Sequence, residues 1–152
     1  MALPNIFTSS VAEGVINRIE NLNTTSTAQW GKMDVSQMLA HCNVVYETIY
    51  EDKHQRPNAF VRFMLKNLVK GSLVNEKPYK KNSSTAAEFI IKGDRNFQEE
   101  KGRLITYINR VKSDGEASFD GKEHFAFGVM TKGEWSNLFY KHLDHHLTQF
   151  GA

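Results

Sequence analysis

The sequence predicts an all-α fold, an up-down four-helix bundle with an extra short helix and long connections. Four stretches repeat apolar side chains at the spacing that places them on one face of a helix. Two of these stretches begin with N-capping signals, at Asp34 and at Thr131. The alternating patterns typical of β-sheets, and the strand–helix alternation of βαβ units, are absent.

The first two helices are defined by both pattern and ends. The first is expected from about Ser9 to Leu22 and is followed by a turn-rich segment. The second begins after Asp34, with Gln37 as the reciprocal partner of a capping box, and continues to about Lys53.

A shorter third helix follows, opened by Pro57 and Asn58 and ended by Gly71. Its apolar residues are expected to face inward, and they are Phe60, Met64, Leu65, Leu68 and Val69. Residues 72–92 include the run EFIIKG, which is a poor candidate for a sheet because it has no partner strand. We expect this segment to be a long connection that packs on the bundle.

The last two long helices complete the bundle. One is expected over residues 96–112, followed by a turn-like segment over 114–130. The final helix begins at Thr131, which forms a capping box with Glu134, and ends at Gly151.

Composition and length place the chain among single-domain globular proteins. It has 152 residues, enough for one domain (1–152) with its own core, and is 40% hydrophobic and 24% charged. The net charge of +2 gives no reason to expect a nucleic-acid partner. No apolar run is long enough to cross a bilayer, so no membrane partner is expected.

The cysteine count and the N-terminus suggest a cytoplasmic protein. Cys42 is the only cysteine, so no intrachain disulfide can form, which fits a reducing compartment. The first residues, MALPNIFTSS, lack the basic and apolar regions of a secretion signal.

The strongest chemical signal lies in the final helix, in the run KHLDHHLTQFG. His142 and His146 are four residues apart, so their rings lie on adjacent turns of one face. That face is otherwise apolar and consists of Trp135, Leu138, Phe139, Leu143, Leu147 and Phe150. Two imidazoles at this spacing can chelate one metal ion, although hydrogen bonds within the core are an equal alternative. His145 is expected at the polar edge, and Asp144 on the opposite side.

A third ligand is expected from the second helix. His41 lies at the edge of its apolar stripe, where a facing helix could present it to the histidine pair. His54 looks solvated, and His124 lies in a loop that it could order. Cys42 falls within the stripe and is interpreted as a small buried hydrophobe, with a role as ligand or nucleophile as the minor alternative.

Three histidines without a fourth protein ligand leave a coordination position for water or substrate, as in catalytic metal sites. Imidazole ligands suit zinc or nickel, and also iron, cobalt or manganese. The motif is not the HExxH of metalloproteases, because Leu143 occupies the position of the general-base glutamate.

Three blocks, WGKMDVSQMLAHC, HFAFGVMTKGEW and YKHLDHHLTQFG, together resemble the DUF1569 family of the DinB/YfiT-like superfamily. The resemblance spans about Trp30 to Gly151 and implies a DinB-like four-helix bundle with a three-histidine metal site. The family pattern matches His41, His142 and His146, and His145 occupies the usual place of a neighbouring histidine. The proline that usually follows the loop histidine is Phe125 here, which weakens any role for His124.

The resemblance also implies a function. Some members of the superfamily are transferases or isomerases that use low-molecular-weight thiols. We therefore expect a metal-dependent enzyme, an S-transferase or a hydrolase, with a small molecule or thiol as partner; the catalytic residues are not defined. The alternatives are a non-catalytic metal-binding or sensor module, and a purely structural histidine cluster. A homodimer is a further expectation, since bundles of this kind often pair.

Overall fold

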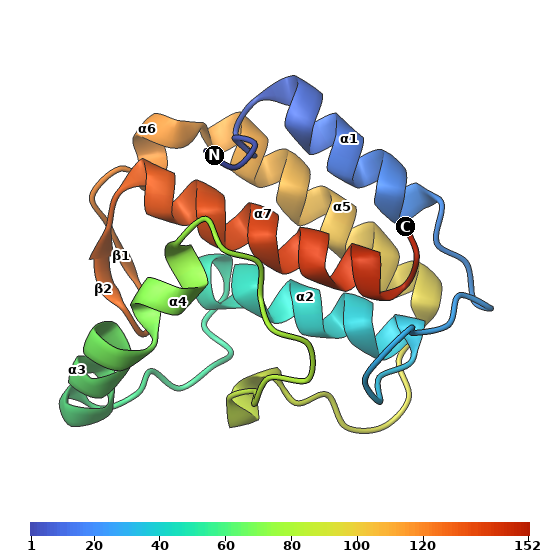
Figure 1. Cartoon of the computed structure of the whole chain (residues 1–152), viewed down its shortest axis with the longest axis horizontal. Coiled ribbons are helices and arrows are strands. Elements are labelled where there is room, and N and C mark those ends of the chain that lie inside the picture. The colour runs from blue at the N-terminus through green and yellow to red at the C-terminus, as the bar shows by residue number, and fades with distance from the viewer.

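The computed structural model describes all residues from 1 to 152. It contains seven α-helices, one 3-10 helix and one antiparallel two-stranded sheet (Figure 1). The elements are α1 (Ser9–Glu20), α2 (Val35–Tyr50), α3 (Ala59–Leu68), α4 (Lys70–Val74), η1 (Ala87–Phe89), α5 (Phe97–Asp114), α6 (Glu116–Phe119), β1 (Lys122–His124), β2 (Gly128–Met130) and α7 (Lys132–Gln149). The predicted all-α class is confirmed, with a small hairpin in addition.

The four long helices α1, α2, α5 and α7 pack lengthwise around the core (Figure 1). Helices α1 and α7 run toward one end of the molecule, whereas α2 and α5 run toward the other. Two contacts show that α2 and α5 are parallel, because the residue numbers rise together along both helices. They are the hydrogen bond from Asn43 to Glu100 and the ion pair between Glu47 and Arg103. The order therefore departs from the expected simple up-down alternation, because the long segment 51–96 carries the chain back before α5 begins.

Aromatic side chains dominate the centre of the core. Trp135, Tyr46, Phe119 and Phe139 are among its largest fully buried residues. The rings of Tyr46 and Phe139 stack with their centroids 5.3 Å apart, which joins α2 to α7. Such contacts fix the two helices that carry the histidines against each other.

The predicted helix starts are confirmed at both capping boxes. The Asp34 side chain accepts a hydrogen bond from the Gln37 amide at 2.8 Å, and the Gln37 side chain accepts one from the Asp34 amide. Thr131 and Glu134 do the same at the start of α7. Helix α2 ends at Tyr50, three residues before the expected position. No helix is both long and apolar enough to span a bilayer.

The expected orientation of the third helix is wrong. Asn58 caps α3 as predicted, and a separate short helix, α4, follows it. Phe60, Met64 and Leu68 are exposed rather than inward, and Leu65 is only half-buried. The helix lies beside the hairpin at one end of the molecule, where no other element covers its outer face (Figure 1).

The connections agree in part with the sequence analysis. The EFIIKG run includes the last two residues of η1 and no strand, and its Phe89 packs against His41 of α2 as expected of a connection on the bundle. The segment predicted to be turn-like holds α6 and the β1–β2 hairpin, whose strands are only three residues each. Strands this short give no detectable alternation. The hairpin is joined to α7 by a hydrogen bond from the Trp135 indole to the Lys122 carbonyl.

Candidate metal centre

The structure brings His41 of α2 together with His142 and His146 of α7. One ring nitrogen from each residue lies within 4.8 Å of the other two. The closest contact joins His41 Nε2 to His142 Nε2 at 3.0 Å. His41 and His146 are buried, with 5% and 8% of their surface exposed, and His142 is half-buried. The three predicted ligands therefore form one group.

The spacing of these nitrogens suits a single ion after a small adjustment. Zinc–nitrogen bonds of about 2.1 Å place two nitrogens about 3.4 Å apart in tetrahedral geometry. The 3.0 Å contact is slightly shorter than this value, and the 4.8 Å limit is longer. Small rotations of the rings, which shift each nitrogen by a few tenths of an ångström to about 1 Å, would bring all three nitrogens to bonding distance from one ion.

The tautomer of His41 is set by the backbone of η1. Its Nδ1 lies 2.8 Å from the carbonyl oxygen of Phe89, which can only accept a hydrogen bond. Nδ1 must therefore carry the proton of the neutral ring, and Nε2 presents a lone pair to the centre of the group. The Phe89 ring also packs edge-on against His41, with the centroids 5.7 Å apart.

The tautomer of His146 is set by Gln149, one turn further along α7. His146 Nδ1 lies 2.8 Å from Gln149 Oε1, while Gln149 Nε2 donates to the Trp30 carbonyl at 2.7 Å. The second bond requires the amide nitrogen to face Trp30, so Oε1 faces the ring and accepts its proton. A carbonyl or amide partner of this kind commonly orients a metal-binding histidine.

Space for Gln149 depends on a glycine. A Cβ atom at position 31 would lie 2.6 Å from Gln149 Nε2, and Gly31 has φ of +85°. Both the close approach and the left-handed backbone favour glycine. The turn before α2 is thus fitted to the amide that holds His146.

Burial keeps the three rings neutral, which is the form that binds metal. Burial lowers the pKa of His41, and lowers that of His146 to about 3. The pKa of His142 lies well below its usual range because of burial first and the neighbouring imidazoles second. Binding of an ion therefore does not have to compete with protonation of the rings at neutral pH.

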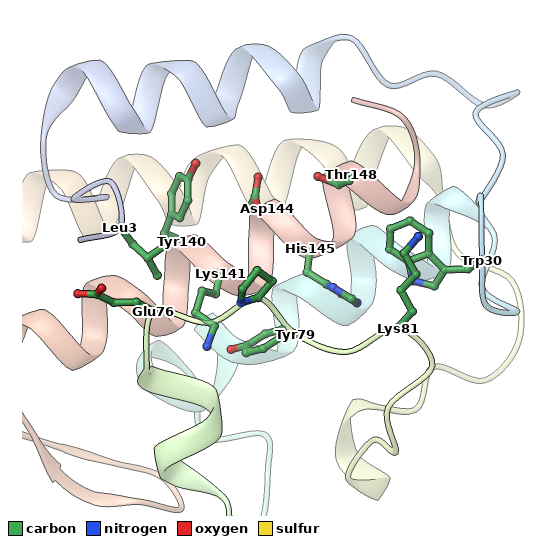
Figure 2. Close-up of a pocket in the computed structure, with 11 residues that line it drawn as sticks. Leu3, Trp30, Glu76, Tyr79, Lys81, Tyr140, Lys141, Asp144, His145 and Thr148 are labelled. Atoms are coloured by element: carbon green, nitrogen blue, oxygen red, sulfur yellow. The ribbon is translucent and has the colours of Figure 1, made fainter. Parts of the chain in front are cut away.

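A cavity of about 200 Å³ lies beside the histidine group, between α7 and the segment that follows α4 (Figure 2). His145 lines this cavity between the rings of Trp30 and Tyr79, at centroid distances of 5.6 and 5.7 Å. The His145 ring also packs against His146 at 5.0 Å. The Lys81 ammonium lies over the Trp30 ring. The His145 ring thus lies between the cavity and His146, a candidate metal ligand.

Two cavity residues are held by interactions of their own. The Lys141 ammonium donates to the Ser72 carbonyl and to two oxygens of Asn75, which fixes the end of α4 to α7. Burial lowers the pKa of Lys141 to about 8. Asp144 forms an ion pair with Arg18 of α1 and points away from the histidine group, as predicted.

The remaining histidines lie outside the group. His124 orders its loop: its Nδ1 accepts hydrogen bonds from the amides of Ala126 and Phe127, and burial lowers its pKa to about 4. His54 is not simply solvated, because its Nε2 contacts a carboxylate oxygen of Glu47 at 2.7 Å.

Cys42 lies next to His41 in sequence but points into the core. Only 1% of its surface is exposed, its sulfur contacts Met38, and burial raises the pKa of its thiol. The interpretation of Cys42 as a buried hydrophobe fits these contacts, and it is not part of the histidine group.

Sequence reasoning did not find the groups that orient the rings. Phe89 acts through its backbone carbonyl, which has no signature in the sequence. Gln149 had a signal: it lies three residues after His146, and a polar residue on an apolar helix face needs a partner.

Comparison with known proteins identifies the family. The model of the family described as "Protein of unknown function (DUF1569)" matches residues 7–152. The chain belongs to the DUF1569 family. No curated protein and no solved structure matches it. The resemblance seen in the sequence is thus confirmed at family level, and the description of DUF1569 assigns no activity.

Proposed function

We propose that this DUF1569 protein is a metal-dependent enzyme that binds one divalent ion through His41, His142 and His146. We further propose that its four long helices form a DinB-like bundle, with the metal between α2 and α7. The reaction is the transfer of a low-molecular-weight thiol, or related small-molecule chemistry such as hydrolysis.

One observation carries this proposal. The Nδ1 atoms of His41 and His146 face a backbone carbonyl and an amide oxygen, so both Nε2 lone pairs are directed inward. A purely structural cluster needs a donor between each pair of nitrogens, and only His142 remains to supply one. Two fixed lone pairs beside a third imidazole are the arrangement expected of a metal site.

The donor set limits the identity of the ion. Three neutral imidazoles without thiolate or carboxylate suit a borderline divalent metal, and we propose zinc or nickel ahead of iron, cobalt or manganese. With three protein ligands, the bound ion would lower the pKa of a coordinated thiol or water and supply a nucleophile near neutral pH.

The chain's own residues have separate roles in this proposal. Phe89 and Gln149 orient the ligands, and burial beneath η1 limits the access of water. The cavity beside His145 is the proposed position of the substrate, since its aromatic wall is adjacent to the ligand His146. Lys81 is the exposed cation on that wall and can contact an anionic substrate group.

The test is a screen of the metal-loaded protein with glutathione, bacillithiol and mycothiol against electrophilic acceptors. We expect activity that is lost in His142→Ala and retained in His54→Ala, which changes a histidine outside the group. Full activity in His142→Ala would refute the metal-dependent mechanism.

The second candidate is a non-catalytic metal-binding module. The burial of His41 and His146 favours it, because structural metal sites are usually closed. It predicts that metal stabilises the fold while no thiol reagent in the screen reacts faster than without protein.

A further inference from the structure

Helix α3 presents its apolar side to solvent. Phe60, Phe63 and Leu68 are 73%, 63% and 70% exposed, and Met64 and Val61 are also exposed. Positions 60, 63, 64 and 68 share one face of a helix. No residue of α3 is buried, so this stripe makes no contribution to the core.

The polar side of α3 faces the protein instead. Arg62 forms an ion pair with Glu123 of the hairpin, and only Leu65 on α3 and Val69 after it pack against the core. The hairpin adds a further exposed apolar residue, Val129, whose carbonyl accepts a hydrogen bond from Lys70. Figure 1 shows α3, α4 and the hairpin together at one end of the molecule.

Positive charge surrounds the apolar stripe. Residues 53–75 contain five lysines and arginines and no acidic residue, although the whole chain has a net charge of only +2. Lys53 and Lys70 pair with Glu51 and Glu134. Arg56 and Arg62 share one carboxylate, that of Glu123, and Lys66 has no ion-pair partner. The rim of the stripe therefore keeps a net positive charge after its internal pairs are counted.

We propose that α3 docks the protein on an anionic lipid surface. A helix with exposed phenylalanine and leucine flanked by cations lies in the plane of a membrane, with its apolar side among the acyl chains. Such contact does not require a spanning segment. It also differs from our expectation of no membrane partner, which rested on the absence of an apolar run long enough to cross a bilayer.

A second copy of the chain fits this surface less well. Pairing two such surfaces would bring two positive rims together. This repulsion between like charges favours an acidic, extended surface over a homodimer.

The test is flotation of the purified full-length chain with vesicles. We expect binding to vesicles of phosphatidylcholine mixed with phosphatidylglycerol, and at least about tenfold less binding to phosphatidylcholine alone or at high salt. Absence of binding to the acidic vesicles at low salt would overturn the proposal.

Variants separate the stripe from other exposed apolar residues. Phe60→Ser/Phe63→Ser changes two side chains that make no core contact, so circular dichroism should show an unchanged fold. It should lose at least about tenfold in binding. Ile90→Ser is the matched control, because Ile90 is also exposed but lies after η1, and it should bind like the unchanged protein.

Oligomeric state provides a further check. Sedimentation should show the same species for the unchanged chain and for Phe60→Ser/Phe63→Ser. A dimer that becomes a monomer in the double variant would overturn the lipid proposal in favour of a second copy. Equal vesicle binding by the double variant and by Ile90→Ser would also overturn it.

Discussion

Replacement of Gln149 by leucine tests how the protein holds His146. Gln149 is buried, and it bridges the His146 ring to the Trp30 carbonyl by bonds of 2.8 and 2.7 Å. Leucine has a similar volume but neither donor nor acceptor. The substitution therefore leaves two polar groups without partners while it changes the packing little.

The magnitude follows from these two bonds. Each buried group left unpaired costs about 1–3 kcal/mol, so the two groups freed by Gln149→Leu should lower the free energy of unfolding of the metal-free protein by about 2–6 kcal/mol. The loss of the partner that orients His146 should also weaken metal affinity by about 10- to 100-fold. Gln98→Leu, at an exposed position of α5, is the control and should change neither quantity appreciably.

Glutamate at the same position separates the two effects. Gln149→Glu keeps an acceptor for the His146 proton but loses the donor to Trp30. It should be destabilised because the Trp30 carbonyl loses its partner, and yet it should bind zinc more tightly than the leucine variant. Urea unfolding and competition with a zinc-chelating dye measure the two quantities. Zinc affinity that is equal in the unchanged protein and in both variants would refute the role of Gln149.

Three further results are expected. Gly31→Ala should destabilise the protein by about 1–3 kcal/mol and weaken zinc binding, because alanine is strained at a φ of +85° and its Cβ would displace the Gln149 side chain. Unchanged urea midpoints would contradict this. The pKa of His124 is about 4 when folded and about 6.5 when unfolded, so the unfolded chain binds a proton first as pH falls. The contribution of neutral His124 to the free energy of unfolding, about 3 kcal/mol, is therefore present above about pH 6.5 and lost as the pH falls from about 6.5 to about 4. His124→Asn keeps an acceptor for the loop and should flatten the stability–pH curve in that window, and an unchanged slope would count against the assignment. Cys42 should react with a thiol reagent only on unfolding, and Cys42→Ala should retain zinc; rapid labelling of the folded chain would contradict its burial.

The elements that the sequence predicted well are those with local signals. The capping boxes at Asp34 and Thr131 need only residues three positions apart, so the starts of α2 and α7 could be predicted closely. The grouping of His142 with His146 follows from helix periodicity alone. The choice of His41 required in addition that α2 lie next to α7, which the apolar stripes and the family resemblance both indicated.

The failures concern questions that periodicity does not answer. An amphipathic pattern shows which side of α3 is apolar, but not whether another element covers that side. Phe60 and Leu68 were therefore assigned to a core that does not reach them. Likewise, no local pattern reports the direction of α5 relative to α2, which depends on the path of residues 51–96. The carbonyl of Phe89 is a backbone group and becomes a partner of His41 only in the folded chain.

The central claim is that His41, His142 and His146 together hold one metal ion, and metal content tests it most directly. The tag-free protein and a His142→Ala/His146→Ala variant should be loaded with zinc, nickel or manganese, desalted, and analysed by elemental mass spectrometry. We predict about one ion per chain in the unchanged protein and none in the variant. Absence of any bound metal in the unchanged protein after loading, or equal retention by the variant, would contradict the account.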